Sequence, residues 1–190
     1  MNISDIEYSK LVSRLDFHDT MRNNLLTFSF TAVLTILGIA LQMELDAISA
    51  WIPLLPFLLI IPFTARISYY RLSSAHIGAF LRVYAFDRVR FEIGAKRVHE
   101  KIGMGKVYSV VAFLVNHEMV LLGLACCFVF YLKYIPCIDM YQWWHYIGLL
   151  IPVVLEIIVL VVAHSTNNYS KMVKNFTDAW KKYPLVDKQQ

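Results

Sequence analysis

The stretch Leu25–Met43, LLTFSFTAVLTILGIALQM, decides the fold class of this chain of 190 residues. It contains 19 residues and no charge. About 20 mostly apolar residues are enough for a helix to cross the hydrocarbon core of a bilayer. A helix is favoured there because it pairs its own backbone polar groups without water. The stretch therefore predicts a membrane-spanning helix.

Three further apolar stretches, at 50–65, 107–132 and 146–163, complete an all-α membrane protein with four transmembrane helices and cytoplasmic amphipathic helices. Charged residues make up only 17% of the chain, whereas about a quarter is usual in soluble domains. The expected parts are an N-terminal cytoplasmic helix at 1–24, a transmembrane hairpin at 25–65, a basic cytoplasmic helical segment at 66–106, a second transmembrane hairpin at 107–164 and a cytoplasmic C-terminal tail helix at 165–190.

The positions of Lys and Arg predict the orientation. Of the 18 such residues, 17 lie before the first span, between the second and third, or after the fourth, and only Lys133 lies on the other side. Lys and Arg are enriched on the cytoplasmic side of a membrane. We therefore expect a multi-pass protein of a bacterial inner membrane with both termini in the cytoplasm.

Helical patterns also occupy the segments outside the spans. Ser4-Asp5-Ile6-Glu7 has the form of a capping box and predicts a helix from about Asp5 into the first span. From Arg66 to about Lys101 apolar residues recur at steps of three and four, which indicates an amphipathic helix. A short amphipathic helix is expected in the tail, ending near Pro184.

The basic segment has two interpretations. It can simply meet anionic lipid headgroups, or it can bind a polyanion such as a nucleotide or a DNA oligomer, whose phosphates Lys and Arg would neutralise. The candidate ligand-binding residues are Arg82, Arg88, Arg90, Lys96, Arg97, Lys101 and Lys106.

A stripe of polar and small residues follows the first span. Its members are Asn24 and the candidate pore-lining residues Thr27, Thr31, Thr35, Gly38 and Gln42. Steps of three and four place them on one helix face, since a helix has 3.6 residues per turn. Such a face either packs against a neighbouring helix or lines a water-filled path.

Polar residues inside the later spans are candidates for function because charge at bilayer depth is costly. They are Asn116, His117, Glu118 and Glu156. We expect Glu118 and Glu156 at similar depths, where they would share protons, bind a cation, or pair with other polar side chains. The outer loops carry Glu44, Asp46 and Asp139, and an acidic mouth would concentrate cations.

The sequence contains no motif for an enzyme, a metal site or a cofactor. Walker A, G-x-G-x-x-G, H-E-x-x-H and the nucleophile elbow are all missing from the printed chain. The three cysteines, Cys126, Cys127 and Cys137, have no metal-ligand spacing. We expect neither catalysis nor a bound cofactor.

The order of elements resembles that of small multi-span effectors of bacterial anti-phage defence, in particular the transmembrane effector of the Hailong system and, more distantly, the two-span SLATT effectors. The likeness rests on a helix with Arg14 and Arg22 before a threonine-bearing span, a hairpin, and AFLRVY at 79–84 followed by Phe91-Glu92. This resemblance implies a tetrameric ion channel that DNA oligomers hold shut. A nucleotidyltransferase-like partner would make these DNA oligomers. Four spans instead of two separate the chain from the SLATT proteins.

Three hypotheses follow. The first is a homo-oligomeric, ligand-gated ion channel that depolarises the membrane. The second is a non-conducting membrane scaffold that recruits a cytoplasmic partner. The third is a proton-coupled carrier or membrane enzyme that uses His117, Glu118 and Glu156.

Overall fold

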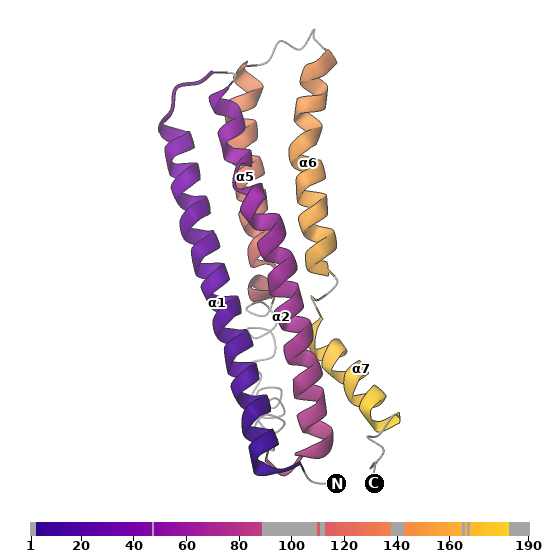
Figure 1. Ribbon diagram of the computed structural model, residues 1–190. Coiled ribbons are helices and arrows are strands. Elements are labelled where there is room, and N and C mark those ends of the chain that lie inside the picture. The colour runs from indigo at the N-terminus through magenta and orange to yellow at the C-terminus, as the bar shows by residue number, and fades with distance from the viewer. Residues whose placement is uncertain are drawn as a thin grey trace. The chain divides into compact units, whose positions relative to one another are not determined.

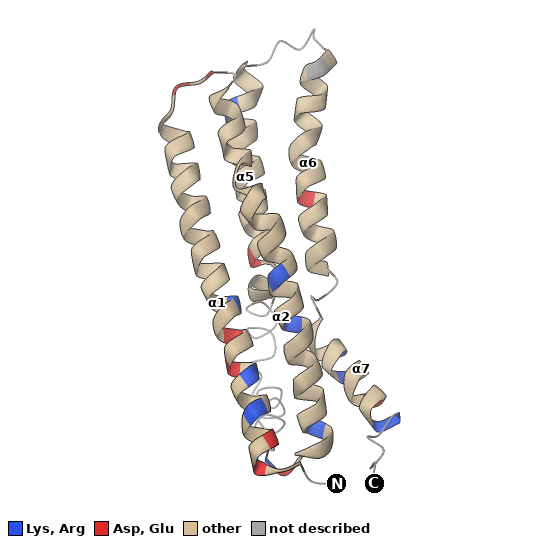
Figure 2. Ribbon diagram, viewed as in Figure 1, with Lys and Arg blue, Asp and Glu red and all other residues tan. Residues whose placement is uncertain are grey.

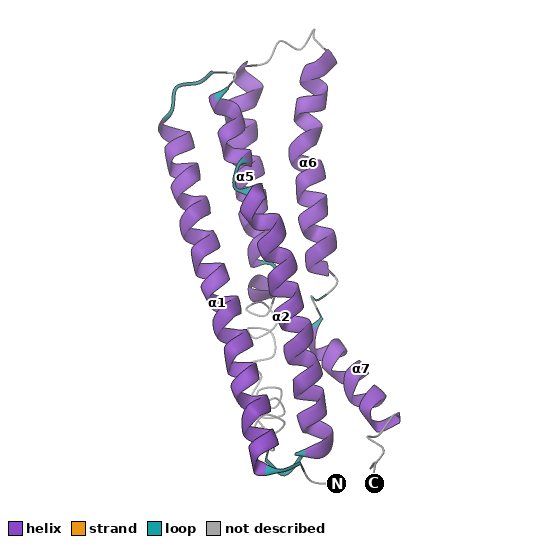
Figure 3. Ribbon diagram, viewed as in Figure 1, coloured by secondary structure: helices purple, strands orange, loops and turns teal. Residues whose placement is uncertain are grey.

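The computed structural model describes residues 3–46, 48–88, 110, 113–137, 143–164, 166 and 168–182. Every element in these ranges is helical (Figures 1 and 3). The elements are α1 (Asp5–Gln42), η1 (Ser49–Leu54), α2 (Phe57–Tyr84), α5 (Glu118–Tyr134), η2 (Ile135–Cys137), α6 (Trp143–His164) and α7 (Tyr169–Lys182). Four helical stretches are long and apolar enough to cross a membrane, which confirms the expected all-α, multi-pass fold class.

The chain forms two compact units. The span unit contains residues 22–68 and 117–167, and the terminal unit contains residues 1–21, 69–116 and 168–190. Charged side chains are sparse on the described helices of the span unit (Figure 2). They gather instead on the first half of α1, the second half of α2 and α7.

Helix α5 organises the span unit because it packs against η1 on one side and against α6 on another. Helices α5 and α6 are antiparallel. The Cys127 thiol donates to the carbonyl of Pro152, and the Tyr131 hydroxyl donates to the carbonyl of Leu149, 2.8 Å away. Phe130 is fully buried in the core of this unit.

The prolines of the second span separate η1 from α2. Proline cannot donate a backbone hydrogen bond and disturbs the turn before it. The segment with Pro53 and Pro56 therefore forms a 3-10 helix and a turn, and the regular helix begins only at Phe57. Trp51 of η1 packs edge-on against Tyr134, with ring centroids 5.4 Å apart.

Lys133 fixes the end of α1 in the span unit. Only 4% of its surface is exposed, and its ammonium group donates to the carbonyls of Ala40 and Met43. The last carbonyls of a helix lack partners within the helix, and a cation there is also favoured by the helix dipole. The one basic residue on its side of the spans is therefore a buried cap of α1.

In the terminal unit, α7 packs its apolar face on the second half of α2. Val173 is buried with Ala75 and Ala79, and the ring of His76 stacks on Phe176 and Trp180 at 4.9 and 5.3 Å. The tail helix predicted from the sequence is thus present.

The N-terminus of α1 has the expected cap. The backbone N–H of Glu7 donates to the hydroxyl of Ser4, 3.2 Å away. This bond satisfies one of the amides that have no partner within the helix, and α1 begins at Asp5 as predicted.

Two helix boundaries differ from the sequence prediction. The helix expected to reach Lys101 ends at Tyr84, and a turn follows in which Arg88 N–H donates to the carbonyl of Ala85. Aspartate, present here as Asp87, favours turns over helix interiors. Residues 89–109 lie outside the described ranges.

A break interrupts the predicted third span: α5 begins at Glu118, while residues 107–109, 111 and 112 lie outside the described residues. Residues 113–116 are helical, but His117 leaves the helix with φ −115° and ψ 15°. The carbonyls of Val115 and Asn116 accept hydrogen bonds from the guanidinium group of Arg71, at 2.8 and 3.2 Å. Arg71 therefore provides hydrogen-bond donors for the last carbonyls of this short helical segment.

We predict that Lys133→Met lowers the unfolding free energy in detergent by about 1–3 kcal/mol, because two helix-end carbonyls lose a charged donor. Lys174→Met, on the exposed face of α7, is the matched control. Thermal unfolding of both purified variants measures the difference. Equal midpoints for wild type and Lys133→Met would contradict the capping role.

Candidate functional site

The inner face of α1 is apolar. Ser29, Val33, Leu37 and Ala40 are buried, and they recur at steps of three and four. The Ser29 hydroxyl donates to the carbonyl of Leu25, 2.7 Å away, so it requires no partner on another helix.

The polar stripe lies on the opposite face of α1. At about 100° per residue, its centre is roughly half a turn away from Val33. Asn24, Thr27, Thr31, Thr35 and Gln42 are all exposed, and Gly38 is half-buried. A Cβ added at Gly38 would have no neighbour within 4 Å. Within the described residues, the stripe therefore does not serve to pack α1 against its own chain.

The threonine hydroxyls of the stripe bond back to their own helix. Thr31 donates to the carbonyl of Thr27 at 3.0 Å, and Thr35 donates to the carbonyl of Thr31 at 2.7 Å. A hydroxyl has one donor and two acceptor lone pairs. With the proton engaged, each oxygen presents acceptor capacity to whatever faces the stripe.

The loop between α1 and η1 carries two of the predicted acidic residues. Glu44 is exposed, and Asp46 is an exposed residue whose carboxylate accepts hydrogen bonds from the backbone of Ser49 and Ile48. The Ser49 backbone hydrogen bond lowers the pKa of Asp46 below its usual value. Asp46 is therefore a fixed negative charge at neutral pH, while Asp139 lies outside the described residues.

Glu118 and Glu156 do not lie at the same height. Glu156 is opposite Gly123 in the antiparallel α5–α6 pair. Glu118 precedes Gly123 by five residues, which is about 7.5 Å along the axis. Glu118 is half-buried in the first turn of α5, where the helix dipole favours a carboxylate. The two carboxyl groups are therefore offset along the α5–α6 pair, and their depth in a membrane stays a prediction.

Glu156 is the buried carboxyl of the span unit, with 6% of its surface exposed. Neither oxygen has a hydrogen-bond partner among the described residues. Its Oε2 occupies the space beside Gly123, since a Cβ built there would lie 2.1 Å from this oxygen and 3.4 Å from the ring of Phe57. A buried, unpartnered polar group is costly and unusual in a native structure.

Asn116 and His117 mark the break before α5. Both are half-buried, and the Asn116 carbonyl accepts from Arg71. No group of three or more His, Cys, Asp or Glu side chains in the described residues has the geometry of a metal site. The polar sequence at 116–118 thus coincides with a helix boundary.

Two of the predicted ligand-binding residues lie in described ranges. Arg82 is exposed on α2. Arg88 makes an ion pair with Asp5 and lies over the ring of Tyr8, 5.0 Å from its centroid. Arg90, Lys96, Arg97, Lys101 and Lys106 lie outside the described residues.

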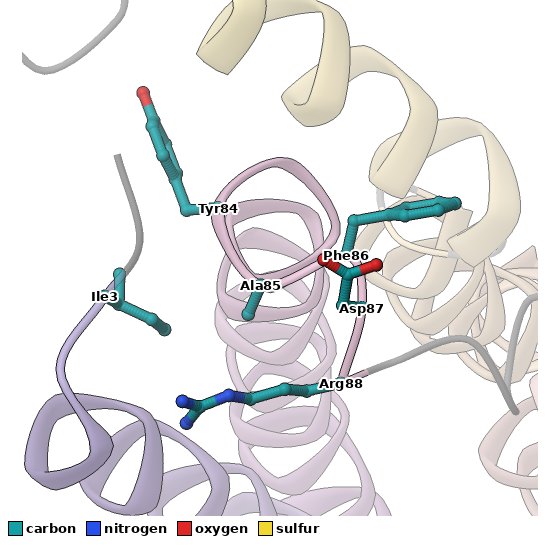
Figure 4. Close-up of a pocket in the computed structure, with 6 residues that line it drawn as sticks. All are labelled: Ile3, Tyr84, Ala85, Phe86, Asp87 and Arg88. Atoms are coloured by element: carbon teal, nitrogen blue, oxygen red, sulfur yellow. The ribbon is translucent and has the colours of Figure 1, made fainter.

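A small pocket adjoins Arg88. Its lining consists of Ile3, Tyr84, Ala85, Phe86, Asp87 and Arg88. In Figure 4 the Arg88 side chain extends toward the start of α1, and Phe86 points in another direction. The pocket combines one cation, Arg88, and one carboxylate, Asp87, with aromatic and apolar walls.

Three residues of the site were not assigned a role from the sequence: Lys133, Arg71 and Gly123. Lys133 and Arg71 act over 90 and 44 residues of sequence separation, which no periodicity reveals. The one sequence feature that pointed to a special role was the position of Lys133. Of the 18 Lys and Arg residues, it alone lies between the third and fourth predicted spans.

No protein-family model, curated protein or solved structure matches this chain. The assignment of a function therefore depends on the geometry of the chain itself.

We predict that Gly123→Ala lowers the unfolding free energy by about 1–3 kcal/mol, because the added methyl overpacks the α5–α6 contact. Gly78→Ala is the control: its Cβ would meet only the Tyr169 hydroxyl, at 3.7 Å, and alanine is favoured over glycine in helices by about 0.5–1 kcal/mol.

A double-mutant cycle with Glu156→Ala identifies the cause of the loss. Shortening Glu156 removes the clash, so the double variant should lose less stability than the two single losses added together. Strictly additive losses would show that Glu156 and Gly123 are not in contact.

Proposed function

We propose that this protein is a homo-oligomeric ion channel whose path is lined by the polar stripe of α1. The observation that carries the proposal is the position of the stripe, opposite the buried face of α1 and exposed on the single chain. The pore-lining residues are Thr27, Thr31, Thr35, Gly38 and Gln42.

A ring of copies gives this face a suitable environment. The side-chain amides of Asn24 and Gln42 have donors that lipid tails cannot satisfy. If the stripes of several copies face a common axis, these amides meet water or each other. Closed cyclic symmetry is the usual arrangement of soluble and membrane homo-oligomers, and we propose four copies.

The chemistry of the stripe favours cations. Oxygen acceptors can replace part of the hydration shell of a cation, and Thr31 and Thr35 have already committed their protons to the helix. The ionised Asp46 and the exposed Glu44 belong to the outer loop next to the end of α1. Negative charge at a channel mouth raises the local cation concentration.

We further propose that the channel lies in a bacterial inner membrane with both termini in the cytoplasm. The distribution of Lys and Arg along the sequence supports this orientation. In this topology the terminal unit, with Arg82 and Arg88, is on the cytoplasmic side.

The ligand we propose is a polyanion such as a DNA oligomer or a nucleotide. Arg88 supports this, because it is held by a carboxylate that a phosphate could replace. Arg82 is exposed on the same unit. We also propose a nucleotidyltransferase-like partner that makes the ligand, and a role as a depolarising effector of anti-phage defence. Both proposals rest on the resemblance of the order of elements to that of such effectors.

A proton-coupled carrier is the second candidate. It is favoured by one observation, the buried and unpartnered carboxyl of Glu156. The scaffold hypothesis has less support, because the apolar face of α7 already packs on α2.

The central test is cation flux through the purified protein in liposomes. We predict that Thr31→Val with Thr35→Val reduces the flux roughly tenfold or more, since an apolar constriction excludes water and ions. Thr64→Val is the matched control, because its hydroxyl also bonds to the carbonyl four residues earlier, at 2.6 Å, but is buried in α2.

The same liposomes distinguish the candidates. Flux that is unchanged in the double valine variant, with assembly intact, would exclude the stripe from the path. Flux that saturates with substrate and depends on a proton gradient would favour the carrier.

The ligand is tested by adding short single-stranded DNA to the terminal-unit side. We predict that DNA changes the flux and that the effect weakens at high salt, because phosphate contacts release counterions. Arg82→Gln with Arg88→Gln should weaken the effect at least about tenfold. Lys10→Gln, which removes one exposed charge from α1, is the control.

A DNA effect that is equal in wild type and the double glutamine variant would place the ligand elsewhere. Flux that no DNA concentration alters would contradict a polyanion of this class.

A further inference from the structure

A buried carboxyl group of the span unit, that of Glu156, is explained neither by the packing around it nor by the proposed channel. Glu156 is buried at 6% exposure near the middle of α6, and both carboxyl oxygens are without a hydrogen-bond partner in the described residues. The Oε2 atom points at the backbone of Gly123 on α5. We propose that Glu156 is a proton-binding site, and that its neutral carboxylic acid form holds α5 and α6 together.

The surroundings of Glu156 disfavour a charge. The ring of Phe57 from α2 lies beside the same point on Gly123. On α5, the titratable groups that interact with Glu156 are the thiols of Cys126 and Cys127. A thiol is a weak donor and a weak acceptor, so neither group stabilises a carboxylate. An isolated carboxylate in such a place costs far more than a neutral acid.

A proton suits the site better than a metal ion. Sodium, magnesium and calcium are bound by several oxygen ligands, whereas the groups around Glu156 are a glycine backbone, an aromatic ring and two thiols. Binding of a proton requires only the carboxylate itself. The proton comes from water and returns to water when the site empties.

Because α5 and α6 pack closely at Glu156, the stability of their contact depends on whether Glu156 carries a proton. Gly123 leaves just enough space for the acid at the α5–α6 contact. A carboxylate attracts water, and hydration of this buried side chain would disturb the close contact between α5 and α6 at Gly123. The folded form therefore favours the protonated state, and its stability should fall as the pH rises and Glu156 ionises. This inference does not depend on the channel proposal.

Infrared difference spectroscopy on the purified protein in detergent tests the proposal directly. At neutral pH the wild type should show the C=O stretching band of a protonated, non-hydrogen-bonded carboxylic acid, and the band should shift in D₂O. Glu156→Gln should lose this band. Glu118→Gln is the control variant, since it removes the other carboxyl of the span unit's helices and should leave the band in place.

Stability gives a second readout in the same samples. The unfolding midpoint of the wild type should fall as the pH rises above about 4, where glutamate ionises in an unfolded chain, and should level off once Glu156 ionises in the folded protein. The midpoint of Glu156→Gln, which mimics the neutral acid, should fall less. Absence of the band at neutral pH in wild type would overturn the proposal even if Glu156→Gln fails to fold. A band that remains in a folded Glu156→Gln variant would also overturn it.

Discussion

The attachment of α1 to its own chain determines which face of this helix is exposed. One face, with Val33, Leu37 and Ala40, is buried in the span unit. The end of the helix is held by the buried ammonium group of Lys133, which donates hydrogen bonds to two carbonyls that otherwise lack a donor. Because these two interactions fix the rotation of α1, the polar stripe must face outward from the single chain. That outward position is the observation on which the proposed oligomer rests.

A general physical rule, that polar groups shielded from water need partners, divides the polar residues into classes. The threonines of α1 satisfy their own protons and keep their acceptors. Arg71 is satisfied by the carbonyls at the break before α5. Glu156 has no such partner among the described residues, and protonation is the remaining way to remove its cost. The structural clamp, the proposed channel lining and the proposed proton site are thus three answers to one requirement.

Composition and periodicity were sufficient for the fold class. Four apolar stretches predicted the four span-length helices, and S-x-x-E predicted the start of α1. The end of α2 at Tyr84 and the helix break at His117 were missed, because a turn at Ala85–Arg88 and the clamp of Arg71 on Asn116 involve specific local and long-range contacts. The stripe was visible in the sequence, but its direction was not. Direction depends on which face of α1 is buried, and only the packed structure fixes that face.

Cysteine accessibility along α1 tests the central claim most directly. In a background with the three native cysteines replaced by alanine, single cysteines at Thr31, Thr35, Val33 and Phe30 would be treated with a membrane-impermeant thiol reagent during flux. We predict modification and block at the two threonine positions, and protection at buried Val33 and at exposed Phe30, which lies about 100° around the helix from Thr31. Modification at Phe30 or Val33 with protection at both threonines would contradict this prediction.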